Sequence, residues 1–509
     1  MHYVKLNSLV LLALIITSGC SPKAAPIDNA VVIDTIETDR SKIYQSAQPE
    51  QKLFKLEEVL AKAIKHNLDA KVSELDALIA ADDVNLQMLN ALPSINAKIQ
   101  RQGRNNEGGS SSFSVLTNTE SLQPSISQEQ YRNIVQLTTE WNLLDTGINL
   151  WRGKTASDQM LIAQERRRKI YQGVVQDSYI AFWRAAVAQQ ALPKIETLTN
   201  KIDKRLEKDE QQTAQGIVPL GDSQTRKTKL LDQKAQLNRL KNGLSLAQLE
   251  LKTLIAYPLD QEIKLDLDNQ DLLGKAYLPK VNASIEDYEL QALTNRPEIR
   301  EEILNKRIST RDIKLSILET IPGVELLLTR NYDSNRFLVH NSWVDGIAGL
   351  TVAINKIFTA PTRYKKAKNI DALSDQRRQA LLAAIITQVH VAVSRYSMLG
   401  NAYQEQTKSV KHAQKILKRA VDYNDVGLMS KAELLNTEVD YNIANINRAF
   451  AFADAQDAYG RLINTLGIDL WDEKNPDFSI ENYAAQIRKN LDKSNLVKTT
   501  ATQNELVGS

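Results

Sequence analysis

Apolar and polar positions follow one regular pattern over the longest stretch of the chain. From Thr362 to Asn475 the chain has no proline, and apolar or small residues recur at alternating steps of three and four. These positions are Leu382, Ile385, Val389, Ala392, Tyr396, Leu399, Tyr403, Val410, Ala413, Leu417 and Ala420. Such a repeat, of ~3.5 residues, is typical of a left-handed coiled-coil seam. The pattern stops at Gly427 and resumes at Val439, which predicts a helix ~100 Å long, a tip and a return helix.

The same hairpin pattern occurs twice. In a first register, the second hairpin matches the first when Gly427 is placed on Gly216. A second register relates the segments that precede the hairpins, and it places Pro322 on Pro93. The two registers differ because the first half holds additional residues before its hairpin. We expect them in residues 103–131, whose Gly, Ser and Gln content indicates a flexible loop. A duplicated architecture follows.

The segments before the hairpins predict one helix and two strands in each half. Residues 53–92 have helical apolar spacing, and a proline ends that helix. Apolar and polar residues then alternate with period two in residues 95–100 and 135–143, and in residues 324–330 and 349–355 of the second half. Such alternation indicates strands with one apolar face. Outer-membrane barrel strands and ordinary half-buried strands both show it.

Composition and charge exclude several classes of function. The 509 residues include 64 basic and 61 acidic ones, which gives a net charge of +3. The chain therefore lacks the strong positive charge that is typical of nucleic-acid-binding proteins. The five histidines show no ligand spacing, and we expect neither a metal site nor a cofactor. Gly147–Thr155 has the look of a phosphate-binding loop, but five residues separate its glycines where that motif needs four. We expect a protein that is not an enzyme.

The N-terminus predicts export and a lipid anchor. Lys5 supplies a positive charge, and Leu9 to Ile16 form an apolar core too short to cross a bilayer, which takes ~20 apolar residues. Cys20, the only cysteine, follows small residues as in the lipobox of bacterial lipoproteins. Lipidation of Cys20 is favoured, and an ordinary cleaved signal with a chance cysteine stays open. Ser21 after the cysteine resembles the sorting signal for the outer membrane.

These patterns divide the chain into six segments. They are a signal peptide (1–19), a lipid-anchored tether (20–52), the first repeat (53–256), a linker (257–288), the second repeat (289–470) and a polar C-terminal tail without helical periodicity (471–509).

Physical constraints then favour an assembly of several copies. Four strands cannot close a wide barrel, and an open sheet edge is not stable in lipid. Hairpins ~100 Å long also cannot bury their seams alone. Copies arranged around an axis solve both problems, because their strands close one shared barrel and their hairpins form a hollow helical cylinder. The expected fold is mainly α with a transmembrane β part.

With these features the chain resembles the outer-membrane efflux factor family, the TolC-like channels, over residues 53–470. The motifs that carry the resemblance are Leu92-Pro93, Ile321-Pro322, Asn295–Glu298, Trp141–Gly147 and the tips around Gly216 and Gly427. The resemblance implies a homotrimer with a 12-stranded β-barrel in the outer membrane lipid of a Gram-negative bacterium and a 12-helix periplasmic tunnel. It further implies docking to a periplasmic adaptor (membrane fusion) protein and an inner-membrane pump, for efflux or type I secretion.

The resemblance also assigns roles to residues at the tips. Glu433 matches an acidic ring that narrows the tunnel, and Asp222 matches an acid that joins polar links holding the coils shut. Asn436 falls where some members carry a second acid, which puts a double ring in doubt. The residues expected to dock the adaptor are Gly216, Ile217, Val218, Val426, Gly427 and Leu428. A second interpretation of Asp222 and Glu433 stays open, namely solvated acids that favour the dipole of a starting helix.

A different class of protein is the alternative. A periplasmic adaptor or a structural coiled-coil lipoprotein, without a pore of its own, would also combine export with long helices. Adaptors usually carry one hairpin within β-rich modules, so two hairpins with paired strands favour the channel. The sequence leaves the cargo open.

Overall fold

The computed structural model describes nine stretches of the chain. They are residues 26–45, 53–120, 123–216, 220–268, 270–274, 276–281, 283–351, 354–471 and 479–492. The chain divides into two units, one of residues 1–51 and 256–262 and the other of residues 52–255 and 263–509. In the smaller unit, helix α2 (Asn29–Gln45) lies within the segment expected to be a tether. All further elements belong to the larger unit.

The two predicted hairpins are present, in the predicted register. Helices α5 (Leu143–Ala214) and α9 (Ile354–Asp425) have 72 residues each, and both of their ends correspond when Gly427 is placed on Gly216. The return helices α6 (Leu220–Leu254) and α10 (Lys431–Thr465) have 35 residues each and correspond in the same register. Helix α9 begins before the predicted start at Thr362 and passes through Pro361. That proline removes one backbone hydrogen bond, which a helix of this length tolerates.

The second register is also confirmed, although the helix predicted over residues 53–92 is two helices. Helices α3 (Leu56–His66) and α4 (Leu68–Leu89) match α7 (Ile285–Asn295) and α8 (Pro297–Leu318) end for end. Asn67 separates α3 from α4, because its backbone is extended and its side chain accepts a hydrogen bond from the Ala70 amide at 3.1 Å, which starts a new helix. Strand β1 (Leu53–Phe54) precedes α3 and pairs with β8 (Lys264–Leu265).

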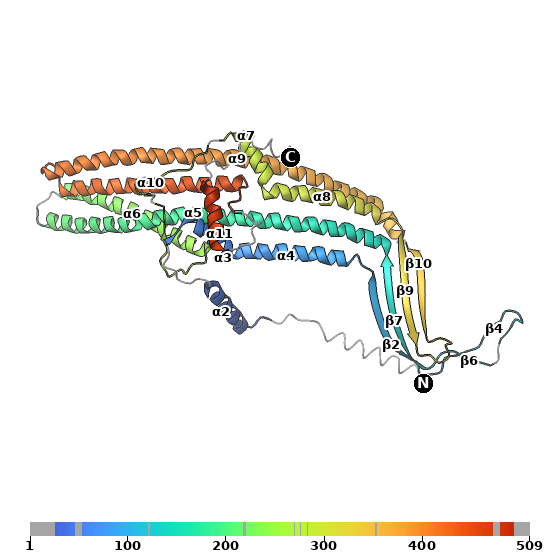
Figure 1. Ribbon diagram of the computed structural model, residues 1–509. Coiled ribbons are helices and arrows are strands. Elements are labelled where there is room, and N and C mark those ends of the chain that lie inside the picture. The colour runs from blue at the N-terminus through green and yellow to red at the C-terminus, as the bar shows by residue number, and fades with distance from the viewer. Residues whose placement is uncertain are drawn as a thin grey trace. The chain divides into compact units, whose positions relative to one another are not determined.

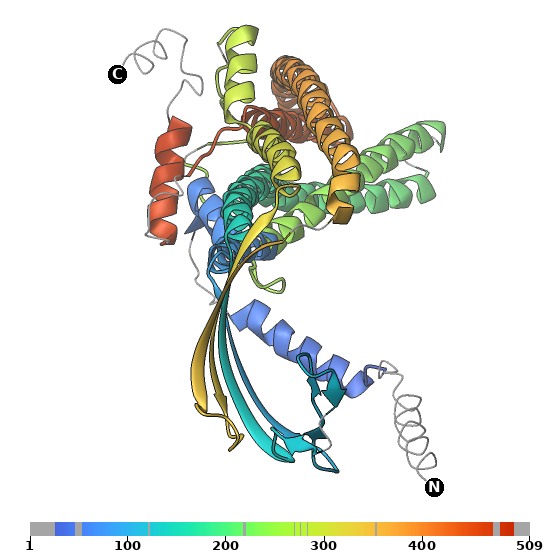
Figure 2. The same cartoon turned by 90° about the vertical axis from the view of Figure 1, so that its right-hand side faces the viewer.

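One antiparallel four-stranded sheet joins the repeats. Its order is β10-β9-β7-β2, with β2 (Ser94–Gly103) and β7 (Tyr131–Asn142) from the first repeat and β9 (Gly323–Asp333) and β10 (Ser342–Thr351) from the second. Figure 2 shows its strands curving together. The fourth strand was predicted at residues 349–355. It begins earlier, at Ser342, and small residues such as Gly346 hide its alternation in the sequence.

The additional residues of the first half lie where they were predicted, but they include paired strands. Residues 104–130 connect β2 to β7, whereas residues 334–341 make the matching connection in the second repeat. Within the longer connection, β3 (Gly109–Ser110) pairs with β6 (Ser125–Ile126), and β4 (Phe113–Ser114) pairs with β5 (Thr119–Glu120). The predicted flexible loop is therefore a small hairpin.

The helices pack along their lengths. Helices α4, α5, α8 and α9 run side by side and end next to the strands, and beyond α8 the helix α10 packs against α9 and α5 (Figure 1). The predicted seam of α9 is buried at Ile385, Val389, Ala392 and Tyr396. Helix α9 also contains a stretch long and apolar enough, by length and composition alone, to cross a membrane. The buried apolar residues of the seam account for part of the apolar character of this stretch.

Part of the expected tail is folded. Helix α11 (Ile480–Asp492) packs against α3 and buries Tyr483, Ala484 and Ile487. The spacing of these three residues gives one apolar face, which the sequence analysis did not detect in a segment that is polar on the whole.

Candidate functional site

The four-stranded sheet has two faces of opposite character. The strand register places alternate residues of each strand on the same face. One face, here called the apolar face, consists of Ile95, Ala97, Ile99, Arg101, Gly103, Tyr131, Asn133, Val135, Leu137, Thr139, Trp141, Val324, Leu326, Leu328, Arg330, Tyr332, Ser342, Val344, Gly346, Ala348 and Leu350. Large side chains on it are exposed, Ile99 by 80% and Leu350 by 77%. The described part of one chain therefore leaves much of that apolar surface uncovered.

The opposite face, here called the polar face, carries a hydrogen-bonded network across the strands. The Gln136 amide donates to the Asn331 carboxamide oxygen at 2.9 Å, and Asn331 donates to the Asp345 carboxylate at 2.7 Å. Arg132 pairs with Asp333 at 2.9 Å. A sheet that is apolar and exposed on one side, and polar and ordered on the other, suits a boundary between lipid and water.

The hairpin tips lie at the far ends of the long helices. Gly427 and Gly216 have positive φ angles of 76° and 70°, a conformation that glycine adopts without strain, so both residues end a helix as predicted. At the second tip the Leu428 amide donates to the Tyr423 carbonyl at 2.8 Å. Val426 and Leu428 are exposed by 68% and 79%, which leaves two apolar side chains in solvent. The predicted docking residues Ile217 and Val218 lie outside the described residues.

Glu433 forms a capping box at the start of α10. Its carboxylate accepts hydrogen bonds from the Ser430 amide at 3.1 Å and from the Ser430 hydroxyl at 2.9 Å. These two bonds lower the pKa of Glu433. The side chain is exposed, so it is available to ions as well as to the helix. Asp222, its counterpart in the first repeat, lies in the first turn of α6, and its side chain is outside the described part of the structure.

Asn436 lies one turn further along α10 and faces inward. Its side chain is 7% exposed, and the Gln233 amide donates to its backbone carbonyl at 3.3 Å. Its carboxamide oxygen is buried without a hydrogen-bond partner in the described structure. Within one chain Asn436 therefore contacts the neighbouring helix α6, whereas Glu433 faces solvent.

Sequence reasoning missed the polar links that join the two hairpins near their tips. The Asp440 carboxylate accepts hydrogen bonds from Gln233 at 2.6 Å and from Lys229 at 3.2 Å. Lys201 pairs with Glu438 at 2.6 Å. Lys229 and Asp440 occupy equivalent positions of the two repeats. Opposite charges at equivalent positions do not by themselves predict such a link, because Lys227 and Glu438 are also equivalent and pair with Glu210 and Lys201 instead.

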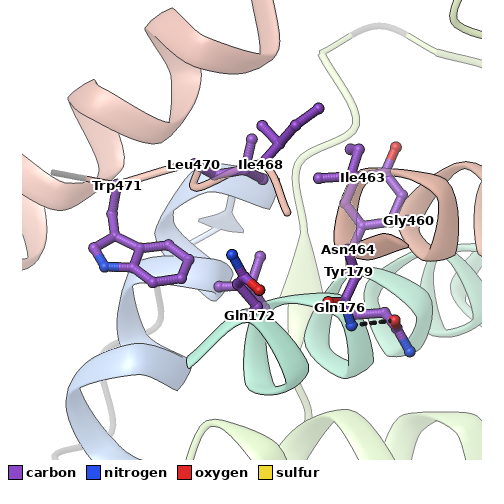
Figure 3. A pocket seen from close by; sticks show the side chains of 10 residues that line it. Gln172, Gln176, Tyr179, Gly460, Ile463, Asn464, Ile468, Leu470 and Trp471 are labelled. Atoms are coloured by element: carbon purple, nitrogen blue, oxygen red, sulfur yellow. Dashed lines mark hydrogen bonds between the residues drawn. The ribbon is translucent and has the colours of Figure 1, made fainter. Parts of the chain in front are cut away.

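A pocket between two of the long helices is too small for a substrate. It lies where α5 meets the end of α10, and Figure 3 shows Asn464 joined to Gln176 there by a hydrogen bond, which measures 2.6 Å. Its volume is about 10 Å³, room for roughly one water molecule. Trp471, Gln172 and Tyr179 also line it. Among the described residues no three His, Cys, Asp or Glu side chains are placed to hold a metal ion. Cys20 lies outside the described residues.

Comparison with known proteins places the fold. No protein-family profile matches the chain, and no curated protein matches it significantly. Among solved structures, the chain is similar to the CmeC outer membrane channel of Campylobacter jejuni, with 13% identity over 85% of this chain and 89% of that one and a TM-score of 0.63. It is similar to the MtrE outer membrane channel of Neisseria gonorrhoeae in its open state, with 17% identity, coverage of 81% and 89%, and a TM-score of 0.63.

A third similar structure is the outer membrane protein VceC of Vibrio cholerae, with 13% identity, coverage of 81% and 96%, and a TM-score of 0.59. The chain thus spans most of each protein, and the likeness at such low identity is one of fold. The resemblance drawn from the sequence is confirmed at that level: this chain has the fold of these outer-membrane channels.

Proposed function

We propose that the protein is the outer-membrane exit duct of a tripartite efflux or type I secretion system. In this role it passes cargo from an inner-membrane pump and a periplasmic adaptor to the outside. The observation that carries the proposal is the two-faced sheet, with its exposed apolar face and its hydrogen-bonded polar face. The fold shared with outer-membrane channels supports it.

The open sheet edges support a homotrimer. Strands β2 and β10 are the two edges, and each leaves a row of backbone groups unpaired within the sheet. Such edges are costly in lipid, where no water satisfies them. Pairing β10 of one copy with β2 of the next removes every edge of this sheet. Three copies then give a barrel of 12 strands, with the polar face lining an aqueous lumen.

Exposed apolar stripes on the helices support the same assembly. Helix α4 exposes residues that recur at steps of three, four and seven, namely Leu68, Val72, Leu75, Ile79, Leu86 and Leu89. Helix α9 exposes Ile357, Phe358, Ile370 and Leu373 on its half next to the strands. Since α4 and α9 are the outer members of the row α4, α5, α8, α9, one copy's α4 would pack against the next copy's α9.

We assign the channel gate to the tips. In a trimer, three copies of Glu433 would surround the axis, and like charges at close range attract cations. Asp222 would act with the link between Lys229, Gln233 and Asp440 to hold the hairpins together. The exposed Val426 and Leu428, with Gly216, Ile217, Val218 and Gly427, would receive the adaptor. Lipidation of Cys20 would place the chain at the outer membrane. The six segments, from signal peptide to polar tail, would then be an export signal, a lipid-anchored tether, two channel-forming repeats with their linker, and a tail.

Single-channel conductance of the purified protein in planar bilayers tests the proposal. We expect discrete cation-selective steps that enlarge in the double variant Asp222→Ala, Glu433→Ala. Asp232→Ala is the matched control, since this exposed carboxylate lies on the same helix as Asp222 and away from the tip. Heat-modifiable trimers in the outer-membrane fraction should accompany the conductance.

Each outcome separates the candidates. Steps that the double variant leaves unchanged would retain the channel and reject the gate. A well-folded oligomer extracted from the outer membrane without any conductance would reject the channel and favour an adaptor or a structural coiled-coil lipoprotein.

A further inference from the structure

Two arginines interrupt the apolar face of the sheet. Of all the residues on that face of β2, β7, β9 and β10, only Arg101 and Arg330 carry a charge at neutral pH. The polar face, by contrast, carries six charged residues, namely Lys98, Arg132, Glu140, Glu325, Asp333 and Asp345. A positive charge on a lipid-facing surface is costly, so the two arginines require an explanation.

The two arginines occupy equivalent positions near the same end of the sheet. Arg330 corresponds to Arg101 in the second register, which relates β9 to β2. Arg101 lies two residues from the end of β2, and Arg330 lies three residues from the end of β9. These are the strand ends away from helices α4 and α8 (Figure 1). At ~3.3 Å per residue, both side chains begin within roughly 10 Å of that end.

Tyrosines accompany the arginines there. The guanidinium of Arg101 lies 6.0 Å from the centre of the Tyr131 ring, and Tyr332 follows Arg330 on the same face of β9. Arg330 has apolar cross-strand neighbours, Leu137 on β7 and Val344 on β10. Neither arginine forms an ion pair within the described residues. Tyrosine and arginine together are typical of the interface between hydrocarbon and headgroups.

A second copy of the chain does not supply the missing anion from its strands. In the proposed trimer, the neighbours of this face are β2 and β10 of adjacent copies, and their residues on the apolar face include no acid. The strands of the assembly therefore leave both guanidinium groups without an acidic partner on this face. A guanidinium presents a planar fork of donors that matches phosphate oxygens in pairs.

We infer that Arg101 and Arg330 bind the phosphate groups of anionic lipids in the leaflet at the outward end of the barrel. The inference rests on the proposed function, which sets the helices in the periplasm and this strand end outside. Each trimer would carry two such arginines per copy around its circumference. Their long side chains reach from the apolar surface to the headgroup layer, which lowers the cost of placing the charge there.

Lipid retention by the purified full-length trimer tests the inference. The trimer is reconstituted with phosphatidylcholine and bisphosphorylated lipid A, washed in detergent, and the lipid A bound per trimer is measured by mass spectrometry. We expect wild type to retain lipid A over phosphatidylcholine, and Arg101→Gln with Arg330→Gln to retain at least threefold less. The double lysine variant should retain an intermediate amount, and Lys98→Gln, on the polar face of the same strand, should match wild type.

Equal retention by wild type and the double glutamine variant would overturn the inference, as would a wild type without preference for lipid A. Conductance measured on the same samples keeps the two proposals apart. If wild type forms channels but both proteins retain the same amount of lipid A, only the assignment of the arginines is rejected. If folded wild type forms no channels, the proposed role as an exit duct is rejected. Glutamine removes charge from an apolar surface, so it favours insertion and does not threaten folding.

Discussion

Helices α6 and α10 hold equivalent places in the two repeats, yet they are buried very differently. Both have 35 residues and both return from a glycine tip. Helix α6 buries one seam of leucines, whose members Leu230, Leu237, Leu244 and Leu251 follow each other at steps of seven. Helix α6 also buries Gln233 and Lys252. Helix α10 packs against both α5 and α9 and buries a longer series of polar residues, among them Asn442, Asn445 and Arg448. The shared spacing of apolar residues makes both segments helical. The helices packed against each segment then determine which of its residues are buried.

The difference shows where the duplicated fold departs from symmetry. Equivalent positions carry a lysine and an aspartate at residues 229 and 440, and a lysine and a phenylalanine at residues 241 and 452. The free side of α6 exposes Leu246 by 67%, and in the proposed trimer a neighbouring copy would cover it. Departures from the repeat are therefore the positions at which variants distinguish the two hairpins.

The largest expected contrast is between Phe452→Ala and Lys241→Ala. Phe452 is fully buried, with its ring 5.3 Å from that of Trp183 and 5.6 Å from that of Tyr403. Removing the ring should lower the free energy of unfolding by about 3–5 kcal/mol. Lys241 is exposed, and its truncation should change that energy by no more than about 0.5 kcal/mol. Urea unfolding followed by circular dichroism measures both, and equal losses would contradict the difference in burial.

A smaller effect is expected at the link between the hairpins. Asp440→Ala removes one of the two acceptors of the buried Gln233 amide, which keeps the Asn436 carbonyl, and the partner of Lys229; this should cost about 1–2 kcal/mol. If the link holds the tips together, single-channel conductance should also rise. The exchange Lys229→Asp with Asp440→Lys keeps the opposite charges at equivalent positions and should restore part of the closed state. An exchange no better than Asp440→Ala alone would show that the charge pair contributes nothing.

The order and ends of most helices could be predicted from the sequence, because the apolar spacing and the registers of the repeats can be read from the residue order. The two registers reproduce the ends of eight helices, and the prolines and tip glycines mark where several of those helices stop. The break at Asn67 was missed, since one side-chain cap interrupts an otherwise continuous apolar spacing. The start of β10 was missed because its glycine and alanine residues do not produce a clear alternation of apolar and polar side chains.

Side-chain partners could not be predicted in the same way. Asn436 was grouped with Glu433 because the resemblance places it where some family members carry a second acid, yet its side chain is buried and that of Glu433 is exposed. Only packing against α6 distinguishes them. The arginines on the apolar face became visible once the strand pairing showed which face each residue occupies.

The same substitution at two glycines should have opposite effects on stability. Gly427 has a φ of 76°, so Gly427→Ala strains the backbone and should cost about 1 kcal/mol, although its new methyl group meets no atom within 4 Å. Gly243 lies inside α6 and also has free space, so Gly243→Ala should stabilise the helix by about 1 kcal/mol. Thermal unfolding midpoints give both signs. A stabilising Gly427→Ala would contradict the left-handed turn at the tip.

The smallest change in stability is expected at Glu433, where it separates a helix cap from a gate. Glutamine keeps an oxygen that accepts the Ser430 hydrogen bonds and removes the charge, so Glu433→Gln should leave stability nearly unchanged. Glu433→Ala loses the cap as well, at about 0.5 kcal/mol. If the carboxylate narrows the channel, both variants should weaken block by divalent cations to the same degree. A block that only the alanine variant weakens would assign Glu433 to the helix alone.

The pH dependence of that block identifies the carboxylate. Hydrogen bonds from Ser430 hold the pKa of Glu433 below its ordinary value of 4.5. The charge, and the cap it strengthens, is therefore fully present above that value and is lost only as pH falls through the lowered pKa. Cation block of single channels should persist as pH is reduced from 7 to 4.5. A block that disappears between pH 6 and 5 would show that the pKa of the ring is raised instead, as mutual repulsion of three carboxylates around the axis would do.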